Sequence, residues 1–265
     1  MRIPFAQIDA FADAPFAGNP AAVMPLTAWL DDAVLQAIAA ENNLSETAFL
    51  IPDDTGAADF ALRWFTPAAE VALCGHATLA SGHFVLSSGE ARTAVTFRTR
   101  QAGVLSVTRA DAGYALALPA WKPSPRDLSD VARTLGVAAP VETLWHDKAY
   151  ALIVAPDAAT VRALDPTPGD LATLEPMVAV VTARGDDTDI VSRVFTPGYG
   201  IHEDPVTGSA HAVAVPYWAE KLGRTRMTAF QASTRGGRLG CSLEGDRVVL
   251  GGGCVTVIEG TFLLP

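Results

Sequence analysis

Two short stretches of the sequence combine polar side chains with a glycine where an apolar helix is expected to begin. They are Cys74, Gly75 and His76 in the first half of the chain, and Thr207, Gly208 and Ser209 in the second. The start of a helix carries unpaired backbone N–H groups and about half a positive charge. Each stretch is therefore suited to bind a carboxylate or to stabilise a developing oxyanion. The alternative is that Thr207 and Ser209 are only helix caps.

Glu46 is the residue whose type and surroundings best suit proton transfer. If residues 44–51 are extended, the two-residue period places Glu46 on the same face as Leu44, Ala48 and Leu50. A carboxylate on an apolar face costs free energy unless it is paired or protonated, and such a group is suited to general acid/base catalysis. The alternative interpretation is a surface glutamate at the end of a strand.

These candidate residues belong to an internal repeat. The sequence Phe-Thr-Pro begins at Phe65 and again at Phe195, which lies 130 residues later. Glu70 and Glu203 are 133 residues apart, so three residues are inserted before the second glutamate. A duplicated chain predicts two similar domains that build one site from related but non-identical halves.

The differences between the two copies predict an asymmetric site. In the alignment, Cys74 matches Thr207, His76 matches Ser209, Asp204 matches Val71 and, at the offset of 130, Glu46 matches Pro176. Only the first half then carries a base. This suits the movement of one proton between carbons better than a racemisation that uses two equal bases.

The elements that must position these residues are strands around two apolar helices. Residues 47–51 and 60–65 are expected to be strands, and another helix is expected from an N-cap at Thr27 to Asn42. Residues 75–86 and 208–222 form Ala-rich runs that are apolar on nearly all sides, and Gly223 ends the second run. Such helices are typically surrounded by other elements. Each half is therefore predicted to be a strand-rich shell around one helix.

The predicted domain boundary is a proline-rich stretch. Three prolines fall within residues 119–125, where neither a helix nor a paired strand continues easily. We therefore predict an α/β (α+β) protein with a first domain over residues 1–118 and a second over residues 126–254. A C-terminal strand near residues 255–264 has no partner in the first half and is expected to return to it.

Composition excludes several classes of function. The chain has 265 residues and a formal charge of -10, and its arginines form no cluster, which argues against nucleic-acid binding. No apolar run approaches the roughly 18–20 residues of a membrane span, and the N-terminus lacks the apolar core of a signal peptide. Three cysteines without CxxC spacing argue against a disulfide framework or a structural zinc site. We expect a cytoplasmic protein with no membrane partner.

Four stretches of the chain together resemble the PhzF-like isomerases of the phenazine-biosynthesis family. They are Asp-Ala-Phe to Gly-Asn-Pro over residues 9–20, Asn-Leu-Ser-Glu-Thr over 43–47, Phe-Thr-Pro to Cys-Gly-His-Ala over 65–77, and Gly-Ile-His-Glu-Asp-Pro-Val-Thr-Gly-Ser-Ala over 200–210. The resemblance implies a fold similar to diaminopimelate epimerase, with two α/β domains, each a mixed sheet curled around a central helix. It also implies a site between the domains, a homodimer, and no metal or organic cofactor.

The resemblance further implies a reaction and a set of site residues. Glu46 is expected to shuttle a proton between two carbons of a small carboxylic acid. The residues expected to bind or steer that substrate are His76, Asp204 and Ser209, with lesser contacts from Asn19, Gly208, Cys74 and Gly75.

Cys74 departs from the family pattern and leaves other interpretations of the function open. Family members that make phenazines tend to have a small nonpolar residue there, whereas the related epimerases have cysteines at both helix starts. Here the second position is Thr207, so a racemase with two thiols is not expected. An epimerase or dehydratase that uses Cys74 with Glu46 is one alternative, and a non-catalytic protein that binds small acids is another. A Cys-His hydrolase and a metal site at His76 and His83 have weaker support from the spacing.

Overall fold

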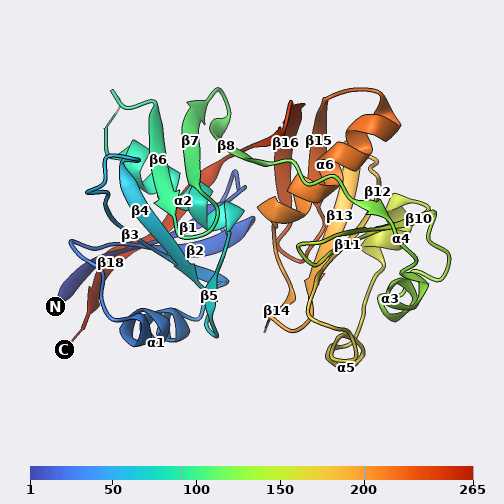
Figure 1. Ribbon diagram of the computed structural model, residues 1–265, viewed down its shortest axis with the longest axis horizontal. Helices are drawn as coiled ribbons and strands as arrows, with labels where there is room; N and C mark the ends of the chain where they lie inside the picture. Colours follow the sequence, from blue (N-terminus) through green and yellow to red (C-terminus); the bar gives the residue numbers. More distant parts are fainter. Residues whose placement is uncertain (90, 200, 265) are drawn as a thin grey trace. The chain divides into compact units, whose positions relative to one another are not determined.

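The computed structural model divides the chain into two compact units (Figure 1). It describes residues 1–89, 91–199 and 201–264; Gly200, with which the fourth family-like stretch begins, lies outside them. Unit 1 comprises Met1–Ala117 and the C-terminal stretch from Gly251, and unit 2 comprises Leu118–Leu250. The first domain was predicted to end at residue 118, one residue after the division, whereas the second was predicted over residues 126–254 and the unit spans Leu118–Leu250, so the proline-rich stretch lies inside unit 2.

Unit 1 contains a mixed sheet. Its strands pair in the order β18, β1, β2, β3, β4, β6, β7, β8, and β5 pairs with the end of β4. The pairs β2–β3 and β4–β6 are parallel and the others antiparallel. The strands are β1 (Arg2–Ala10), β2 (Asn19–Pro25), β3 (Glu46–Pro52), β4 (Phe60–Phe65), β5 (Glu70–Val71), β6 (Ala94–Thr99), β7 (Val104–Ala110), β8 (Gly113–Pro119) and β18 (Cys254–Leu263).

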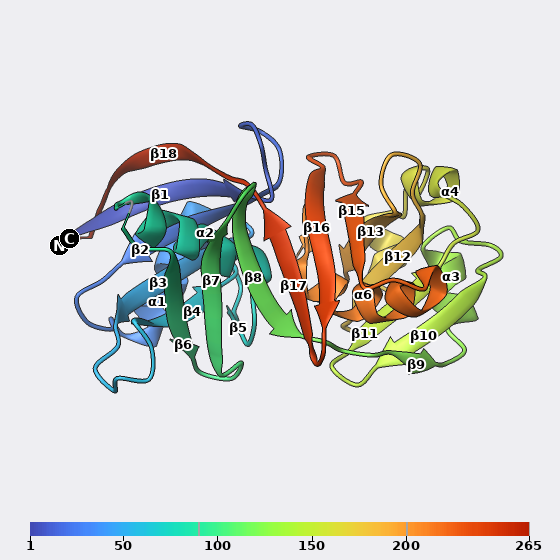
Figure 2. The ribbon, with the colours of Figure 1, turned by 90° about the horizontal axis from the view of Figure 1, so that it is seen from above.

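The sheet of unit 1 curls around helix α2 (Gly75–Ser87), as Figure 2 shows. The helix contacts β1, β2, β3, β6, β7 and β18, and the residues from Gly75 to Gly82 are all buried. A Cβ atom at Gly82 would lie 2.4 Å from a methyl carbon of Val107 on β7. Glycine at this position therefore permits the close approach of helix and strand.

Helix α1 (Asp32–Asn42) packs on β3 and β4 and begins later than predicted. The N-cap is Asp31 and not Thr27. The backbone N–H of Leu26 donates to the carbonyl of Leu50 at 2.8 Å, so the chain is still extended beside β3 where the helix was expected to start. The buried residues Leu35, Ile38 and Ala39 join one hydrophobic cluster of the unit.

Unit 2 repeats the mixed sheet. Its strands pair in the order β9, β10, β11, β12, β13, β15, β16, and β14 pairs with β13. The pairs β11–β12 and β13–β15 are parallel. The strands are β9 (Ser124–Pro125), β10 (Glu142–His146), β11 (Tyr150–Val154), β12 (Val178–Arg184), β13 (Ile190–Thr196), β14 (Ile201–Glu203), β15 (Arg226–Gln231), β16 (Gly237–Glu244) and β17 (Arg247–Gly252).

Helix α6 (Gly208–Leu222) is the buried helix of unit 2. It contacts β11, β12 and β16, and its residues from Gly208 to Ala219 are buried. It ends at Gly223 in the left-handed conformation, with φ +66°, as predicted. The short helices are α3 (Ser129–Thr134), α4 (Ala158–Arg162) and α5 (Pro168–Leu171). Among the helices of the described residues, none combines the length and the apolar character needed to cross a bilayer.

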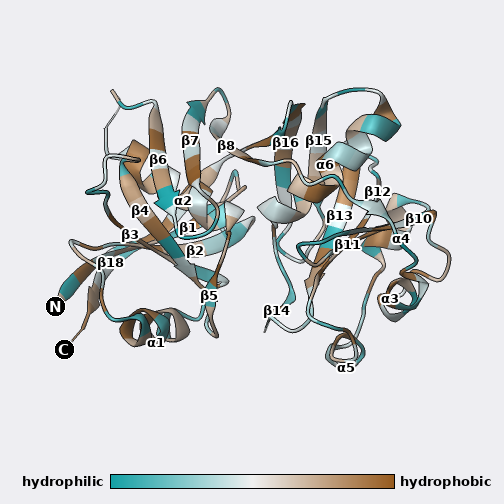
Figure 3. Cartoon of the chain, in the orientation of Figure 1, coloured by the Kyte–Doolittle hydropathy of each residue, from teal (hydrophilic) through white to brown (hydrophobic). Residues whose placement is uncertain are grey.

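The two units share one topology, which confirms the predicted α/β fold with an internal duplication. The parallel, antiparallel and parallel pairings of β2, β3, β4 and β6 recur in β11, β12, β13 and β15. Apolar residues run along strands of both units, including β13 (Figure 3). Each unit places one buried helix, α2 or α6, against such a set of strands.

The strand register corrects the alignment of Glu46. Glu46 and Val178 each precede the residue that pairs with the first residue of Phe-Thr-Pro. The predicted alignment of Glu46 with Pro176 is therefore wrong by two residues. The loop after the strand spans residues 53–59 in unit 1 but only 185–189 in unit 2, and a constant offset cannot represent this change in length. Val178 is apolar, so it remains true that only unit 1 carries a carboxylate here.

Candidate active site

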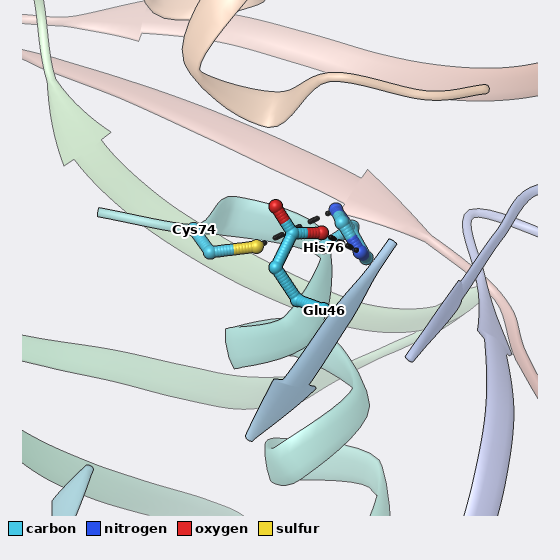
Figure 4. Close-up of side chains that lie close together, drawn as sticks. All are labelled: Glu46, Cys74 and His76. Carbon is cyan, nitrogen blue, oxygen red and sulfur yellow. Dashed lines mark hydrogen bonds and ion pairs between the residues drawn. The ribbon is translucent and has the colours of Figure 1, made fainter. Parts of the chain in front are cut away.

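In unit 1, β3 and α2 bring Glu46, Cys74 and His76 together (Figure 4). The Nε2 atom of His76 lies 3.0 Å from Oε2 of Glu46, and the Sγ atom of Cys74 lies 3.5 Å from the other ring nitrogen, Nδ1. The Nδ2 atom of Asn19 lies 3.1 Å from the same Nδ1. His76 is 3% exposed and Glu46 13%. The four side chains thus form a nearly closed polar cluster around one imidazole.

Local backbone geometry sets the positions of Asn19 and Glu46. Gly18 has φ +65°, and a Cβ atom there would lie 2.2 Å from the carbonyl oxygen of Ala10, so this turn requires glycine. The turn starts β2 at Asn19. Asn43 ends α1 in the left-handed conformation, with φ 47°, and the chain then enters β3 at Glu46. Because β2 and β3 are parallel neighbours, their first residues start at the same end of the sheet.

The Cys74 thiol keeps its proton at neutral pH. Burial raises its pKa, the nearby carboxylate of Glu46 raises it further, and the result is about 11. A thiol in this state is a poor nucleophile, because the thiolate is the reactive form. This argues against the Cys-His hydrolase alternative and against a role for Cys74 as a resting base.

The pKa of His76 is raised well above the ordinary histidine value. Burial alone would lower it, but the charges of Cys74 and Glu46 raise it and prevail. Because Cys74 holds its proton to about pH 11, Glu46 is the partner that acts at neutral pH. In the neutral form of the ring, Nδ1 accepts from the NH2 group of Asn19, which leaves the ring proton on Nε2, the nitrogen that lies 3.0 Å from Glu46. The cluster therefore couples a proton on the imidazole to the carboxylate.

The state of Cys74 gives a first prediction. Native protein at pH 7 is expected to react slowly with iodoacetamide at all three cysteines, because burial raises the pKa to about 11 for Cys74 and to about 12 for Cys241 and Cys254. Mass spectrometry should find three modified thiols only after unfolding in urea. Labelling of Cys74 in the native state should accelerate as the pH is raised toward 11. Rapid, selective labelling of Cys74 at pH 7 would contradict the assignment.

In unit 2, Asp204 and Thr207 form a second polar group before helix α6. Asp204 is buried, and its backbone N–H donates to the carbonyl of Val194 at 3.0 Å. The hydroxyl of Thr207 donates to Oδ2 of Asp204 at 2.5 Å. Thr207 is the N-cap residue of α6, but its side chain makes no capping hydrogen bond. The interpretation of Thr207 as a simple helix cap is therefore wrong.

Gly208 and Ser209 form the first turn of α6, and both are buried. A helix has no internal partners for its first backbone N–H groups, and the Thr207 side chain does not cap them. The first turn of α6 therefore offers donors that suit an anionic ligand. Gly75 occupies the same place in α2, where Cys74 is the N-cap residue and likewise makes no side-chain capping bond.

The structure groups the predicted residues within each unit. Glu46, Cys74 and His76 cluster with Asn19 in unit 1, next to Gly75 at the start of α2. Asp204, Gly208 and Ser209 lie around the start of α6 in unit 2.

The cluster in unit 1 also has the donor types of a metal site. One donor atom from each of Glu46, Cys74 and His76 lies within 4.8 Å of the others. Binding of a metal through Cys74 would require loss of a proton that the thiol holds to about pH 11. The alternative pair of His76 and His83 is not formed, because the ring nitrogens of His83 contact the hydroxyls of Tyr114 and Thr256 at 3.0 and 2.9 Å.

Sequence reasoning missed two buried residues beside Thr207. Gln231 accepts a hydrogen bond from the Thr207 N–H at 2.8 Å, and Nδ1 of His211 lies 2.8 Å from the Thr207 carbonyl. The repeat gives no signal for either, because their counterparts in unit 1 are of other types. His211 lies within the run over residues 208–222 that was predicted only as an apolar helix.

Comparison with known proteins identifies relatives over the whole chain. The model of the phenazine biosynthesis-like protein family matches residues 8–260. A Pseudomonas aeruginosa protein named as an uncharacterized isomerase is 48% identical, and the match covers 100% of both chains. The crystal structure of a phenazine biosynthesis protein of the PhzF family from Enterococcus faecalis has 41% identity and a TM-score of 0.90, with 100% of both chains covered.

A more distant solved structure extends the likeness in fold alone. A hydroxyproline epimerase from Agrobacterium vitis shares 12% identity with a TM-score of 0.63, and the match covers 98% of this chain and 92% of that one. This places the fold with the epimerases that resemble diaminopimelate epimerase, as predicted from the sequence.

Proposed function

The chain belongs to the phenazine biosynthesis-like family and is an isomerase, and from this premise we propose that it moves a proton between carbons of a small carboxylic acid, with Glu46 as the single acid/base. One observation carries the proposal. The Glu46 carboxylate is largely buried and lies 3.0 Å from an imidazole that can hold a proton beside it. A positioned carboxylate of this kind can take a proton from one carbon and return it to another.

The neighbours of Glu46 suit this role. The imidazole of His76 lies 3.0 Å from the carboxylate and can steer the proton that the carboxylate receives. Asn19 fixes the ring from the other side at 3.1 Å. The amides at the start of α2, from Gly75 onward, would stabilise an enolate-like charge on the substrate, and one such donor is worth on the order of 3 kcal/mol.

We propose that Asp204, Gly208 and Ser209 bind the polar groups of a small carboxylic acid. The proposal is supported by the family resemblance of residues 200–210 and by the burial of these residues at a helix start that the Thr207 side chain does not cap. The carboxylate of Asp204 suits an amino or hydroxyl group, whereas the first-turn amides of α6 suit a carboxylate. Proton transfer by a glutamate requires no organic cofactor.

Solvent isotope exchange tests the proposed function. Wild-type protein in D2O should incorporate deuterium at carbon into at least one member of a panel of unsaturated and amino-bearing carboxylic acids, detected by NMR. Glu46→Gln should not catalyse this exchange. If both proteins exchange label equally, Glu46 is not the base. If neither exchanges label with any acid of the panel, the chain fits the alternative of a binding protein.

The close approach of Cys74 to His76 at 3.5 Å supports a second candidate, an epimerase or dehydratase in which Cys74 and Glu46 act on opposite faces of one carbon. The raised pKa of the thiol, about 11, allows it to donate a proton but not to accept one at rest.

Replacement of Cys74 by alanine separates the two candidates. We expect Cys74→Ala to retain isotope exchange within a few-fold of wild type, because the proposed mechanism uses no thiol. The burial of Cys74 makes a modest loss of stability the main effect. A loss of exchange as large as that of Glu46→Gln, in protein that still folds, would instead favour the epimerase or dehydratase.

A further inference from the structure

The side chain of Gln231, at the end of β15, is completely buried and serves one loop of unit 2. Its Oε1 atom accepts the backbone N–H of Thr207 at 2.8 Å. Its Nε2 atom donates to the carbonyl of Asp204 at 2.7 Å and to the hydroxyl oxygen of Thr207 at 3.2 Å. Both the oxygen and the nitrogen of the Gln231 amide therefore form hydrogen bonds with the segment from Asp204 to Thr207.

These bonds fix the direction of the Thr207 hydroxyl. A hydroxyl has one proton to donate, and the Thr207 oxygen already accepts from Nε2 of Gln231. Its proton therefore goes to Oδ2 of Asp204, at 2.5 Å. The result is a polarised chain of donors that runs from Gln231 through Thr207 to the Asp204 carboxylate.

His211 binds the other backbone polar group of Thr207, its carbonyl. Its Nδ1 atom lies 2.8 Å from the Thr207 carbonyl, which can only accept, so Nδ1 carries the ring proton. The backbone of Thr207 is thus bound at its N–H by Gln231 and at its carbonyl by His211. This residue immediately precedes Gly208, the first residue of α6.

Among the described residues, this set of contacts around Thr207 has no counterpart at the corresponding strand positions of unit 1. Strand pairing places Gln231 opposite Ser192, and the corresponding pair in unit 1 is Thr99 with Leu62. The Thr99 hydroxyl donates to the carbonyl of Gly103 within its own turn, at 2.9 Å. Gln231 thus occurs in the half of the duplication that carries Asp204, which suggests a purpose beyond the stability of the common fold.

We propose that Gln231 is a positioning residue, which sets the orientation of the Asp204 carboxylate and of the first turn of α6 through Thr207. This inference rests on the proposed function, because it assumes that Asp204, Gly208 and Ser209 bind substrate. The side chain of Gln231 does not touch the substrate in this role. Gln231 affects the reaction because it orients the groups that contact the substrate, which are the Asp204 carboxylate and the first turn of α6.

Two substitutions at this position test the role. Gln231→Leu removes all three hydrogen bonds, and we expect kcat/KM in the isotope-exchange assay to fall about 100-fold, as misplacement by roughly 1 Å does elsewhere. Gln231→Glu keeps the acceptor for the Thr207 N–H but places a second acceptor against the Asp204 carbonyl. Its activity should be restored as the pH is lowered, because a protonated carboxyl can donate to that carbonyl again. Wild type should lack this dependence.

Thr182→Val is the matched control. It removes two other buried hydrogen bonds of unit 2: Nε1 of Trp218 on α6 donates to the Thr182 hydroxyl at 3.0 Å, and that hydroxyl donates to the carbonyl of Val191 at 2.9 Å. We expect a comparable loss of thermal stability with kcat/KM within about two-fold of wild type. Equal kinetic effects of Thr182→Val and Gln231→Leu would overturn the proposal, as would a wild-type pH profile for Gln231→Glu.

Hydrogen exchange separates failure of this inference from failure of the proposed function. The Thr207 amide should exchange faster in Gln231→Leu than in wild type or Thr182→Val, with no substrate present. If this occurs and wild type is inactive toward every acid, the contact is correct and the proposed function is wrong. If wild type is active, Glu46→Gln is inactive and Gln231→Leu retains full kcat/KM, the positioning role is wrong.

Discussion

Glu46→Gln is expected to lower kcat for isotope exchange by roughly 10²- to 10⁴-fold, the usual contribution of a positioned general base. Glutamine has the shape of glutamate but cannot accept a proton from carbon. The groups that we propose to bind substrate are unchanged by the substitution, so KM should change far less than kcat. Rates should be measured by NMR in D2O with the best substrate of the carboxylic acid panel.

The same substitution should change the ionisation of His76, which gives an independent readout. In wild type the Glu46 carboxylate helps to hold the pKa of His76 above the ordinary value, against the lowering effect of burial. Without that charge the pKa of His76 should fall, so the ring in Glu46→Gln should lose its extra proton at a lower pH than in wild type. NMR titration of the ring would show the shift.

Glu41→Gln is the control, because Glu41 is an exposed glutamate on α1 and undergoes the same chemical change. It should leave kcat and the His76 titration unchanged. A kcat for Glu46→Gln within about three-fold of the Glu41→Gln value, in folded protein, would exclude Glu46 as the base.

The fold could be predicted from the sequence where the pattern is periodic or repeated. The α6 boundaries follow from an apolar run closed by Gly223, whose left-handed conformation ends the helix. The start of α1 could not be predicted in this way, because the hydrogen bond between Leu26 and Leu50 keeps the preceding chain extended, and that bond depends on a strand distant in sequence.

The candidate site was predictable in part for the same reason. Glu46 stood out locally, as a carboxylate at the start of an apolar strand, and the repeat marked both helix starts. That His76 lies 3.0 Å from Glu46 depends on the packing of α2 against β3, which no local pattern encodes. Gln231 is less visible still, since its role consists entirely of contacts with a loop more than 20 residues away in sequence.

The loops also explain why the alignment of the copies failed at Glu46 and held elsewhere. Glu70 and Glu203 each pair with the first residue of Phe-Thr-Pro, so the three-residue insertion lies in the turn between the paired strands. The offset for the strand at Glu46 changes because a different loop changes length. Each insertion is thus confined to a connection, and the shared framework of paired strands is preserved.

Arg63 belongs to a duplicated ion pair that is part of this framework. Its guanidinium binds Glu70 through two hydrogen bonds of 2.8 Å, and Arg193 binds Glu203 in the same way at 2.7 and 2.8 Å. Arg63 is only 3% exposed and also lies 5.0 Å above the ring of Phe65. In both units the ion pair joins two paired strands, β4 with β5 and β13 with β14, just before the chain enters the buried helix α2 or α6.

Arg63→Met is therefore expected to destabilise the protein by about 3 kcal/mol, because loss of the buried guanidinium leaves the partly buried Glu70 carboxylate with only the more exposed Arg100 as a counter-charge. Urea unfolding monitored by circular dichroism would measure the loss. Arg100→Met is the control, since Arg100 is 55% exposed and pairs with the same Glu70 at 2.9 Å. Exposed pairs contribute at most about 1 kcal/mol, so the control should lose far less.

A second substitution in the Arg63→Met background shows whether the loss of stability comes from the Glu70 charge or from the lost packing of the Arg63 side chain. Adding Glu70→Gln removes the carboxylate that has lost its buried partner, and part of the lost stability should return if that charge is the cause. No recovery would assign the loss to the other contacts of Arg63, which are its ion pair with Asp32 at 2.9 Å and its contacts with the rings of Phe65 and Trp29. Because the segment after Glu70 leads to Cys74 and His76, Arg63→Met should also reduce isotope exchange under conditions where the protein remains folded. Full exchange activity in such protein would show that the cluster around His76 is positioned by α2 and the sheet alone.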